Sequence, residues 1–437
     1  MGDGPGGTSE DPEEEFTEQA RSAGLTLPTR KRVNLWDVTA VTAVIILVSV
    51  GIGVATGWMN PRISNGLPPG LLTPQSCSQE GDQHVTVNGT VAADADPLVA
   101  SSLGIVSNQF TSAYGGCVTF TYGTSGQDAG LGALAALQTD FAVVEVPPTS
   151  TQLAQLPDPV TVVPLGLTAL SIAYYLPGVP NGLNLSGSVL EQIYAGAVTS
   201  WDNPAIAQLN PGVSLPPGLG ISVAYRSDAS ALNSALTGFL AKANSSWNTS
   251  VGQGLQVTWP VGTGMVNSGS MVSWLAGTPG AIGYVETGTS LPSGIGVVKL
   301  ENSGREFVAP NENSLVAAAT VAVNSTPPGR NWTDISPLDT SGSSAYPLAF
   351  LSYAVVYGNL SAAYGGSLSL LFAQWELTYL WWVATDGGYL TTSVGFVPLP
   401  STAVTVTQIV LGKIMFDGKS VLEGSEGGES GGETGEF

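Results

Sequence analysis

The stretch that decides the fold class is Val223–Leu236, which reads VAYRSDASALNSAL. Its first residues complete the run ISVAY, which is typical of a buried strand, and SALTGFLAKANSSW (234–247) has the composition of a helix. Similar alternation occurs earlier, where VTFTY is followed by GLGALAALQ and then by FAVVEV. The longer run VTVVPLGLTALSIAYYL predicts a pair of buried strands. Alternating strands and helices predict an α/β fold with mostly parallel sheets.

Basic residues are scarce in this sequence. It holds 12 Lys and Arg against 33 Asp and Glu, which gives a formal net charge of −21. Nucleic-acid-binding proteins need a basic face for the phosphate backbone, so this balance argues against a nucleic-acid partner. The single histidine, His84, and the two cysteines form no Cys/His cluster, and the sequence has no P-loop motif. We therefore expect no metal, no cofactor and no enzymatic activity.

An apolar run near the N-terminus predicts a membrane anchor. Val38–Trp58 contains no charged residue and is long enough to span a bilayer, and Arg30, Lys31 and Arg32 precede it. Because basic residues stay inside, we expect a single-pass signal anchor over 36–58, with the N-terminus cytoplasmic and the rest of the chain extracytoplasmic at the cell membrane. A cleaved signal peptide is the alternative, although its basic region is normally shorter than the segment found here.

Composition divides the rest of the chain into a folded body and flanking segments. Residues 1–35 read as a disordered acidic tail, 59–84 as a linker and 420–437 as an acidic low-complexity tail. Sequons of the N-x-Ser/Thr type all fall after the predicted anchor and predict a glycoprotein, although a Ser/Thr-rich chain also produces them by chance. The sequons begin at Asn88, Asn184, Asn244, Asn248, Asn324, Asn331 and Asn359.

The cysteines Cys77 and Cys117 are predicted to form one disulfide in an exported domain. Such a bridge closes a loop of about 40 residues and contributes roughly 4 kcal/mol on the chain-entropy estimate. Two separate buried thiols are the alternative.

Polar groups at three predicted strand ends suit an anion. Arg226 offers a guanidinium fork, Asp228 is placed to hold it, and the following helix N-terminus adds backbone N–H groups. The Gly-rich loop 123–130, GTSGQDAG, lets backbone amides approach an oxyanion, and Glu145 ends a buried strand. Each loop also has an explanation without a ligand: an N-cap with a surface salt bridge, Gly-rich composition, or a solvated strand end.

Longer runs resemble the phosphate-binding proteins of phosphate ABC transporters. The runs are AGAVTSWDNPAIAQLNPGVSLP, FLAKANSSW, VTWPVGTG and GTPGAIGYVE, in the family's order and spacing, and the resemblance covers about 85–419. It implies a two-lobed periplasmic-binding-protein (type II) fold, preceded here by the predicted single transmembrane helix. Lobe one would comprise 85–164 and 290–419, and lobe two 165–289, with phosphate in the cleft between them.

The resemblance assigns candidate ligand-binding residues one at a time. The family's Arg-x-Asp-Gly-Ser-Gly-Thr loop matches Arg226, Asp228 and Ser230. This sequence departs from the pattern at Ala231, where the family has a glycine, and at Leu232, where it has a hydroxyl.

The remaining candidates come from lobe one. The family's Asp that accepts the phosphate proton aligns with Glu145, and its first loop places Ala93 and Asp94 where a hydroxyl and a Phe are usual. The Ser of its Gly-Ser loop aligns with Gln127, or with Ser125 across a short gap. Each lost neutral donor is expected to weaken binding by roughly 0.5–1.5 kcal/mol.

The resemblance implies an extracytoplasmic solute-binding protein, and the predicted anchor would attach it to the membrane. It would capture phosphate by closing two lobes around the anion and deliver it to an ABC permease and its ATPase. The altered loops leave alternatives open: a binder or sensor of a different oxyanion, or a surface component that kept the fold and lost the ligand. The aromatic run Phe372–Tyr389 predicts core packing, with a sugar-stacking platform as the alternative.

Overall fold

The computed structural model divides the chain into two compact units, Met1–Asn60 and Pro61–Phe437. The residues described lie in the second unit. The predicted tail 1–35 and anchor 36–58 lie outside them, as do most of the linker and most of the C-terminal tail. In the part of the chain that is described, no helix combines the length and apolar character needed to cross a membrane. The described ranges are 67–74, 85–92, 97–125, 127–326, 333, 335–365, 368–387 and 395–423.

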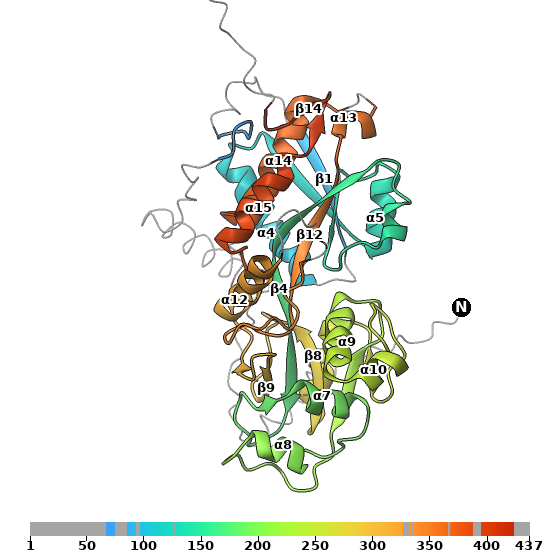
Figure 1. Cartoon of the computed structure of the whole chain (residues 1–437), viewed down its shortest axis with the longest axis vertical. Helices are drawn as coiled ribbons and strands as arrows, with labels where there is room; N and C mark the ends of the chain where they lie inside the picture. Colours follow the sequence, from blue (N-terminus) through green and yellow to red (C-terminus); the bar gives the residue numbers. More distant parts are fainter. Residues whose placement is uncertain are drawn as a thin grey trace, which may run out of the picture. The chain divides into compact units, whose positions relative to one another are not determined.

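One long strand, β4 (Val160–Tyr175), runs through both halves of the main sheet (Figure 1). The sequence predicts two paired strands for this run, and that prediction is wrong. Residues 160–169 pair antiparallel with β12 (Ala349–Tyr357), and residues 170–175 pair antiparallel with β8 (Ala281–Glu286). The strand is therefore shared, and the sheet changes partner partway along it.

The residues that suggest a break in β4 lie at an irregularity of the strand. Pro164 pairs with Tyr353 and Gly166 with Ser352, so Leu165 is an extra residue on one side of the ladder. Proline has no backbone N–H to donate to a ladder, and a bulge is one of the few interior positions that accepts it. The Pro and Gly thus mark a bulge rather than the end of a strand.

Parallel strands flank the central pair. In the first half β1 is parallel to β2 and β3, and in the second half β6 is parallel to β7 and β8. The sheet order is β2-β1-β3-β12-β4-β8-β6-β7, with β9 beside β4. The α/β class is confirmed, but the sheet is mixed rather than mostly parallel, because β4 and β12 run antiparallel to their neighbours. These flanking strands are β1 (Val85–Ala92), β2 (Val118–Ser125), β3 (Phe141–Val144), β6 (Ser222–Arg226) and β7 (Thr263–Met265).

Short strands revise the predicted division into lobes, which assigns all of 290–419 to lobe one. Strand β9 (Ile295–Val297) pairs with residues 173–175 of β4, and β10 (Lys299–Glu301) pairs with β5 (Asn184–Leu185). These segments therefore group with the second half of the sheet, and the chain rejoins the first half at β12. The other short strands are β11 (Phe307–Val308), β13 (Met415–Phe416) and β14 (Lys419–Ser420).

The aromatic run forms a buried helix, α14 (Leu370–Ala384), as predicted. Its Tyr379 stacks on Phe120 at a centroid distance of 3.8 Å, and its Trp375 meets Phe110 edge to face at 6.2 Å. Because Trp375 and Tyr379 are buried, neither ring is open to a sugar. The aromatic cluster joins α14 to α4 (Pro97–Ala113) and β2 in the core of the first half.

Side-chain caps set several helix boundaries. The sequence predicts one helix over 234–247, but α9 (Ala231–Ala243) ends at Asn244, whose Oδ1 accepts from Ser246 N at 2.9 Å and starts α10 (Ser245–Ser250). A side chain that satisfies free N–H groups favours a new helix start over continuation. The other helices are α5 (Gln127–Ala135), α6 (Ser150–Leu153), α7 (Gly187–Tyr194), α8 (Pro204–Leu209), α11 (Ser268–Gly277), α12 (Glu312–Ser325), α13 (Leu360–Ala363) and α15 (Ser401–Leu411).

Candidate functional site

Three neighbouring parallel strands bring polar side chains to one edge of the sheet. Arg226 is the last residue of β6, Glu286 is the last residue of β8, and Ser268 begins α11 shortly after β7. Because β6 lies between β7 and β8, these carboxyl ends meet. In the first half, β2 ends at Ser125 and Glu145 follows β3. Open α/β sheets bind ligands at this kind of edge.

Protein groups already hold the Arg226 guanidinium. Its Nε and Nη2 donate to the two carboxylate oxygens of Asp228 at 2.7 and 2.5 Å, and its Nη1 donates to Ser268 Oγ at 2.7 Å and to Glu286 Oε1 at 3.3 Å. These bonds use four of the five N–H groups of an arginine. Asp228 therefore holds Arg226 as expected. The two adjacent N–H donors of Arg226, Nε and Nη2, were expected to face an anion, but they bind Asp228 instead.

Glu286 forms a buried ion pair with Arg226. Both side chains are 2% exposed. Glu286 Oε1 also accepts from Ser268 Oγ at 2.6 Å, and Oε2 accepts from Thr289 Oγ1 at 3.4 Å. A buried pair is screened little by solvent, so the negative charge of Glu286 acts strongly on groups nearby.

Ser230 caps the helix that follows Arg226. It is fully buried, and its Oγ accepts from Leu232 N at 3.2 Å. Its own N–H donates to Leu255 O at 2.9 Å, which ties this loop to the segment that precedes β7. The first N–H groups of α9 lie at the carboxyl end of β6, which is the arrangement that binds anions at helix N-termini. Leu232, at a position where the phosphate-binding family has a hydroxyl, is buried among the apolar residues of the core.

A second buried network fixes the shape of the Arg226 loop. The Asn233 amide donates to the carbonyl oxygens of Arg226 and Asp228 at 3.1 and 2.9 Å. The Tyr284 hydroxyl accepts from Arg226 N at 2.8 Å and donates to Asn233 Oδ1. Burial raises the pKa of Tyr284, so its hydroxyl stays protonated as a donor.

Glu145 faces this cluster from the first half of the sheet. Its side chain is 3% exposed, and Thr168 Oγ1 donates to its Oε1 at 3.1 Å. Burial, and then the negative charge of Glu286, raise the pKa of Glu145 to about 8, against the opposing effects of Thr168 and Arg226. The raised pKa means that Glu145 keeps its proton to a higher pH than an exposed glutamate does. Its Oε2 has no hydrogen-bond partner among the described residues.

The other predicted site residues are only partly described. Ser125 ends β2, and Gln127 is buried at the start of α5. Ala93 and Asp94 lie outside the described residues. Cys117 is disulfide-bonded, and Cys77, the only other cysteine of the sequence, lies outside the described residues.

Sequence reasoning missed Glu286, Ser268 and Thr168. The signal that selected Glu145, a carboxylate at the end of an apolar strand, applies equally to Glu286 at the end of AIGYVE. No comparable sequence signal marks Ser268 or Thr168. Each lies at the site because of the order of the strands in the sheet, which no local motif indicates.

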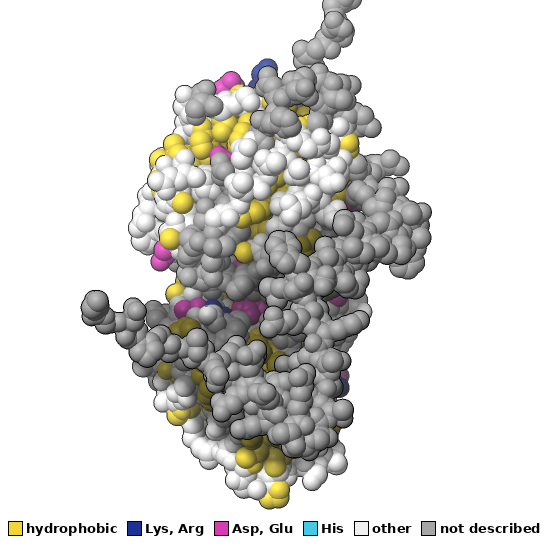
Figure 2. All heavy atoms as spheres, turned by 180° about the vertical axis from the view of Figure 1, so that it is seen from behind, with side chains coloured by type: hydrophobic (Ala, Val, Ile, Leu, Met, Phe, Trp, Pro, Cys, Tyr) yellow, Lys and Arg dark blue, Asp and Glu magenta, His cyan; other side chains and the backbone are white. Residues whose placement is uncertain are grey.

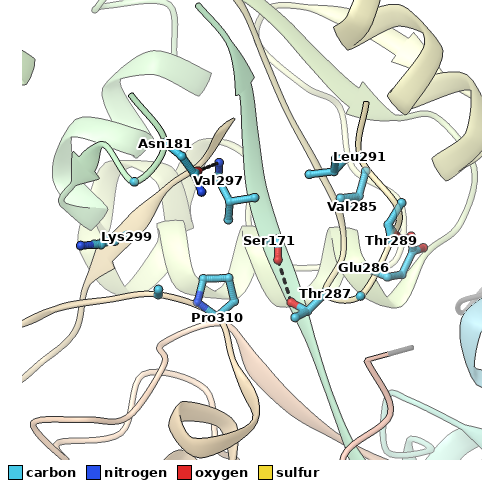
Figure 3. A pocket seen from close by; sticks show the side chains of 13 residues that line it. Ser171, Asn181, Val285, Glu286, Thr287, Thr289, Leu291, Val297, Lys299 and Pro310 are labelled. Carbon is cyan, nitrogen blue, oxygen red and sulfur yellow. Dashed lines mark hydrogen bonds between the residues drawn. The ribbon is translucent and has the colours of Figure 1, made fainter. Parts of the chain in front are cut away.

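A cavity of about 340 Å³ borders the site along β8 (Figure 3). Glu286 and Thr289 lie on one side of it, and the exposed Lys299 lies on the other. Between them, the hydroxyls of Ser171 and Thr287 are hydrogen-bonded at 2.8 Å. Figure 2 shows few charged side chains on the visible face of the described residues. Within the described ranges, no group of three or more His, Cys, Asp or Glu is placed to hold a metal ion.

The two-lobed α/β fold with a polar site at its strand ends defines a class, the periplasmic-binding-protein-like domains. Residues 80–378 match the family model described as the PBP superfamily domain, and the chain belongs to this superfamily.

Similar proteins of known name are phosphate-binding proteins. The chain is 27% identical over 343 residues to the phosphate-binding protein PstS of Xylella fastidiosa (strain 9a5c), and the alignment covers 76% of this chain and 86% of that protein. It is 30% identical over 229 residues to PstS of Methanocaldococcus jannaschii, covering 50% of this chain and 58% of that protein.

Solved structures support the same fold. A phosphate-binding protein from Stenotrophomonas maltophilia aligns with a TM-score of 0.51 and 17% identity, covering 74% of this chain and 93% of that one. A high-affinity periplasmic phosphate-binding protein bound with phosphate aligns with a TM-score of 0.53 and 17% identity, covering 76% of this chain and 99% of that one.

Proposed function

We propose that this protein is an extracytoplasmic solute-binding protein that captures phosphate between its two lobes for an ABC importer. The named relatives are phosphate-binding proteins, and they match over most of the folded body. The observation that carries the proposal is the electrostatic interaction between Arg226 and Glu145. They come from the carboxyl ends of strands in opposite halves of the sheet, and the positive charge of Arg226 acts on the pKa of Glu145.

The two halves contribute different groups to the proposed site. The second half supplies the positive charge of Arg226 and the N-terminus of α9, capped by Ser230. The first half supplies Glu145, together with the strand end at Ser125 and the helix start at Gln127. Closure of the halves around the anion would bring these donors together and exclude water.

Other parts of the proposal concern segments beyond the folded site. The apolar run 36–58 would anchor the protein in the cell membrane, with the binding domain outside. A permease and its ATPase would receive the ligand. Among the sequons, Asn248 and Asn324 are exposed and accessible to glycosylation. Asn184 is less accessible, because its side-chain amide donates to Leu209 O at 3.1 Å.

Isothermal titration of inorganic phosphate into the full-length protein tests this proposal. We expect binding by the wild type, and at least about tenfold weaker binding by Arg226→Lys, because lysine keeps the charge but cannot form the two-pronged bond to Asp228. Arg226→Ala is less suitable, since it leaves Glu286 buried and unpaired, at a cost of about 3–5 kcal/mol.

The control is Arg305→Ala. Arg305 is 84% exposed and pairs only loosely with Glu301, at 3.4 Å. This variant removes a positive charge away from the site and should bind phosphate like the wild type. Thermal melting of each variant checks that it is folded. If the folded wild type releases no heat with phosphate at any pH, the phosphate assignment is rejected, and other oxyanions and then a structural role become the explanations.

A further inference from the structure

Part of the predicted linker packs against the folded body. This segment, the strap (residues 67–74), lies beside α14 of the first half. Thr378 Oγ1 on α14 accepts a hydrogen bond from Leu72 N at 3.0 Å. Gln374 Nε2, one turn earlier on the same helix, donates to Gly70 O at 3.3 Å. The strap is therefore bound through its backbone to a core helix of the first half.

Apolar contacts and a close backbone approach complete this attachment. Leu71 is 8% exposed, and Leu67 and Leu72 pack against the same apolar core. Gly70 has a φ of +83°, and a methyl group there would lie 2.1 Å from Leu422 O. A larger residue at position 70 would therefore push the strap away from the body, because the atom it meets belongs to the backbone.

A covalent bond offers a second attachment to the first half. Cys117, which immediately precedes β2, is disulfide-bonded, and Cys77 is the only other cysteine of the sequence. A bridge between them ties the chain to the first half again, three residues after the strap ends. Both attachments therefore act on the same half of the sheet.

The chain between the strap and the predicted membrane span is short. Eight residues, 59–66, separate Trp58 from Leu67. An extended chain of that length reaches at most about 30 Å. Without the strap the first attachment is Cys77, and the reach grows to about 65 Å. The strap therefore determines how closely the first half is held to the end of the span.

The surface beside the strap suits contact with a lipid bilayer. Pro68, Pro69 and Ile409 line one groove, and Ile409 is 56% exposed although it is apolar. The exposed charges between α15 and the last described residue are equal in number of each sign, so this surface is balanced in a chain of net charge −21. An apolar, uncharged-on-balance surface is not repelled by lipid headgroups. These charged residues are Lys413, Asp417, Lys419 and Glu423.

We infer that the strap orients the protein at the membrane: it holds the first half of the fold against the bilayer, with the surface around Ile409 facing the lipid, and leaves the second half free to move when the lobes close. This inference rests on the anchor and the lobe closure of the proposed function. Phosphate capture would then move the second half, while the first half stays in place.

Energy transfer from a fluorophore on the full-length protein to a dye on the headgroups of lipid vesicles tests the inference. Gln408 on α15 and Gln208 on α8 are both exposed. Figure 1 shows α8 at the opposite end of the fold from β14, which follows α15. Gln408→Cys and Gln208→Cys each accept one fluorophore. Transfer from position 408 should exceed transfer from position 208 at least about threefold, because the short chain limits the distance to the bilayer.

Gly70→Ala displaces the strap and should reduce this ratio at least about twofold, because the longer linker lets the domain reorient. Gly178→Ala is the matched control. Gly178 has a φ of +85° and open space around it, so the variant introduces similar backbone strain away from the strap and should keep the ratio. If Gly70→Ala does not fold, Thr378→Val removes the acceptor of Leu72 N and should reduce the ratio in the same direction.

Addition of inorganic phosphate to the labelled vesicles shows which half moves. Transfer from position 208 should change, and transfer from position 408 should stay constant. Equal transfer from the two positions in the wild type overturns the inference, as does a ratio that folded Gly70→Ala and Thr378→Val both leave unchanged. A phosphate response at position 408 alone also overturns it.

Failure of the proposed function gives different results. If titration detects no phosphate binding but the ratio and its loss in Gly70→Ala are as expected, phosphate capture fails and the orientation by the strap stands. If the full-length protein does not stay with the vesicles, the membrane anchor fails, and the inference fails with it.

Discussion

Replacing Glu145 by glutamine should change how the stability of the ligand-free protein depends on pH. In the folded protein Glu145 has a pKa raised to about 8, whereas its ordinary pKa is 4.5. Between these values the folded state binds one more proton than the unfolded state. The stability that this proton contributes is therefore fully present below the ordinary pKa and is lost as pH rises through the window. Glutamine has the same shape but does not titrate, so the variant lacks this loss.

The size of the effect follows from the shift. One bound proton gives a slope of about 1.4 kcal/mol per pH unit, so the wild type should lose about 3 kcal/mol relative to Glu145→Gln between about pH 5 and about pH 7. The negative charge of Glu286 contributes to the raised pKa of Glu145. Glu286→Gln should therefore lower that pKa and reduce the loss of unfolding free energy with rising pH.

Urea unfolding at the two pH values, followed by circular dichroism, measures the free energy of unfolding of both proteins. Subtracting the free energy of unfolding of the variant from that of the wild type at each pH cancels the contributions of all other titrating groups. Glu306→Gln, at an exposed position, is the control for the loss of one charge. Parallel pH dependence of the wild type and Glu145→Gln would show that folding does not raise the pKa of Glu145, which would contradict the reasoning.

Three further substitutions test features away from the site. Burial raises the pKa of Glu376 well above its ordinary value, so Glu376→Gln should raise the free energy of unfolding at pH 7 more than at about pH 4, as measured in urea. A methyl group at Gly166 would lie 2.5 Å from the Phe396 ring, so Gly166→Ala should cost about 1–3 kcal/mol in thermal melting. Gly104 lies in α4 with open space around it, so Gly104→Ala should stabilise by up to about 1 kcal/mol, and a loss there would contradict the reasoning.

Many of the helices and strands can be predicted from the sequence, because short stretches of neighbouring residues indicate them. Composition alone predicts the strand and helix around Arg226, and the aromatic run of α14 predicts a core helix. The continuity of β4 is not predictable in this way, because Pro164 is normally a strand breaker and only its partner strand shows that it lies at a bulge. The position of β9 beside β4 likewise depends on long-range pairing.

The candidate site is predictable in part for the same reason. Asp228 lies two residues from Arg226, so their pairing is a local event. Glu286 contacts Arg226 only because β8 lies beside β6 in the sheet. The charges of both residues act on Glu145 although it follows β3, which lies in the other half of the sheet. Strand order across the sheet is not encoded in any short motif, and it determines which charges meet.

The insertion of β12 between β3 and β4 has a consequence for how the chain is made. Residues 176–348 separate β4 from β12, so a growing chain completes β3 and β4 long before the strand that joins them exists. Until then, both strands present unpaired edges, which tend to pair with other chains. A truncated product ending before residue 349 should therefore aggregate even though it contains nearly every residue of the proposed site. The C-terminal part of the sequence thus supplies the strand that covers the open edges of β3 and β4.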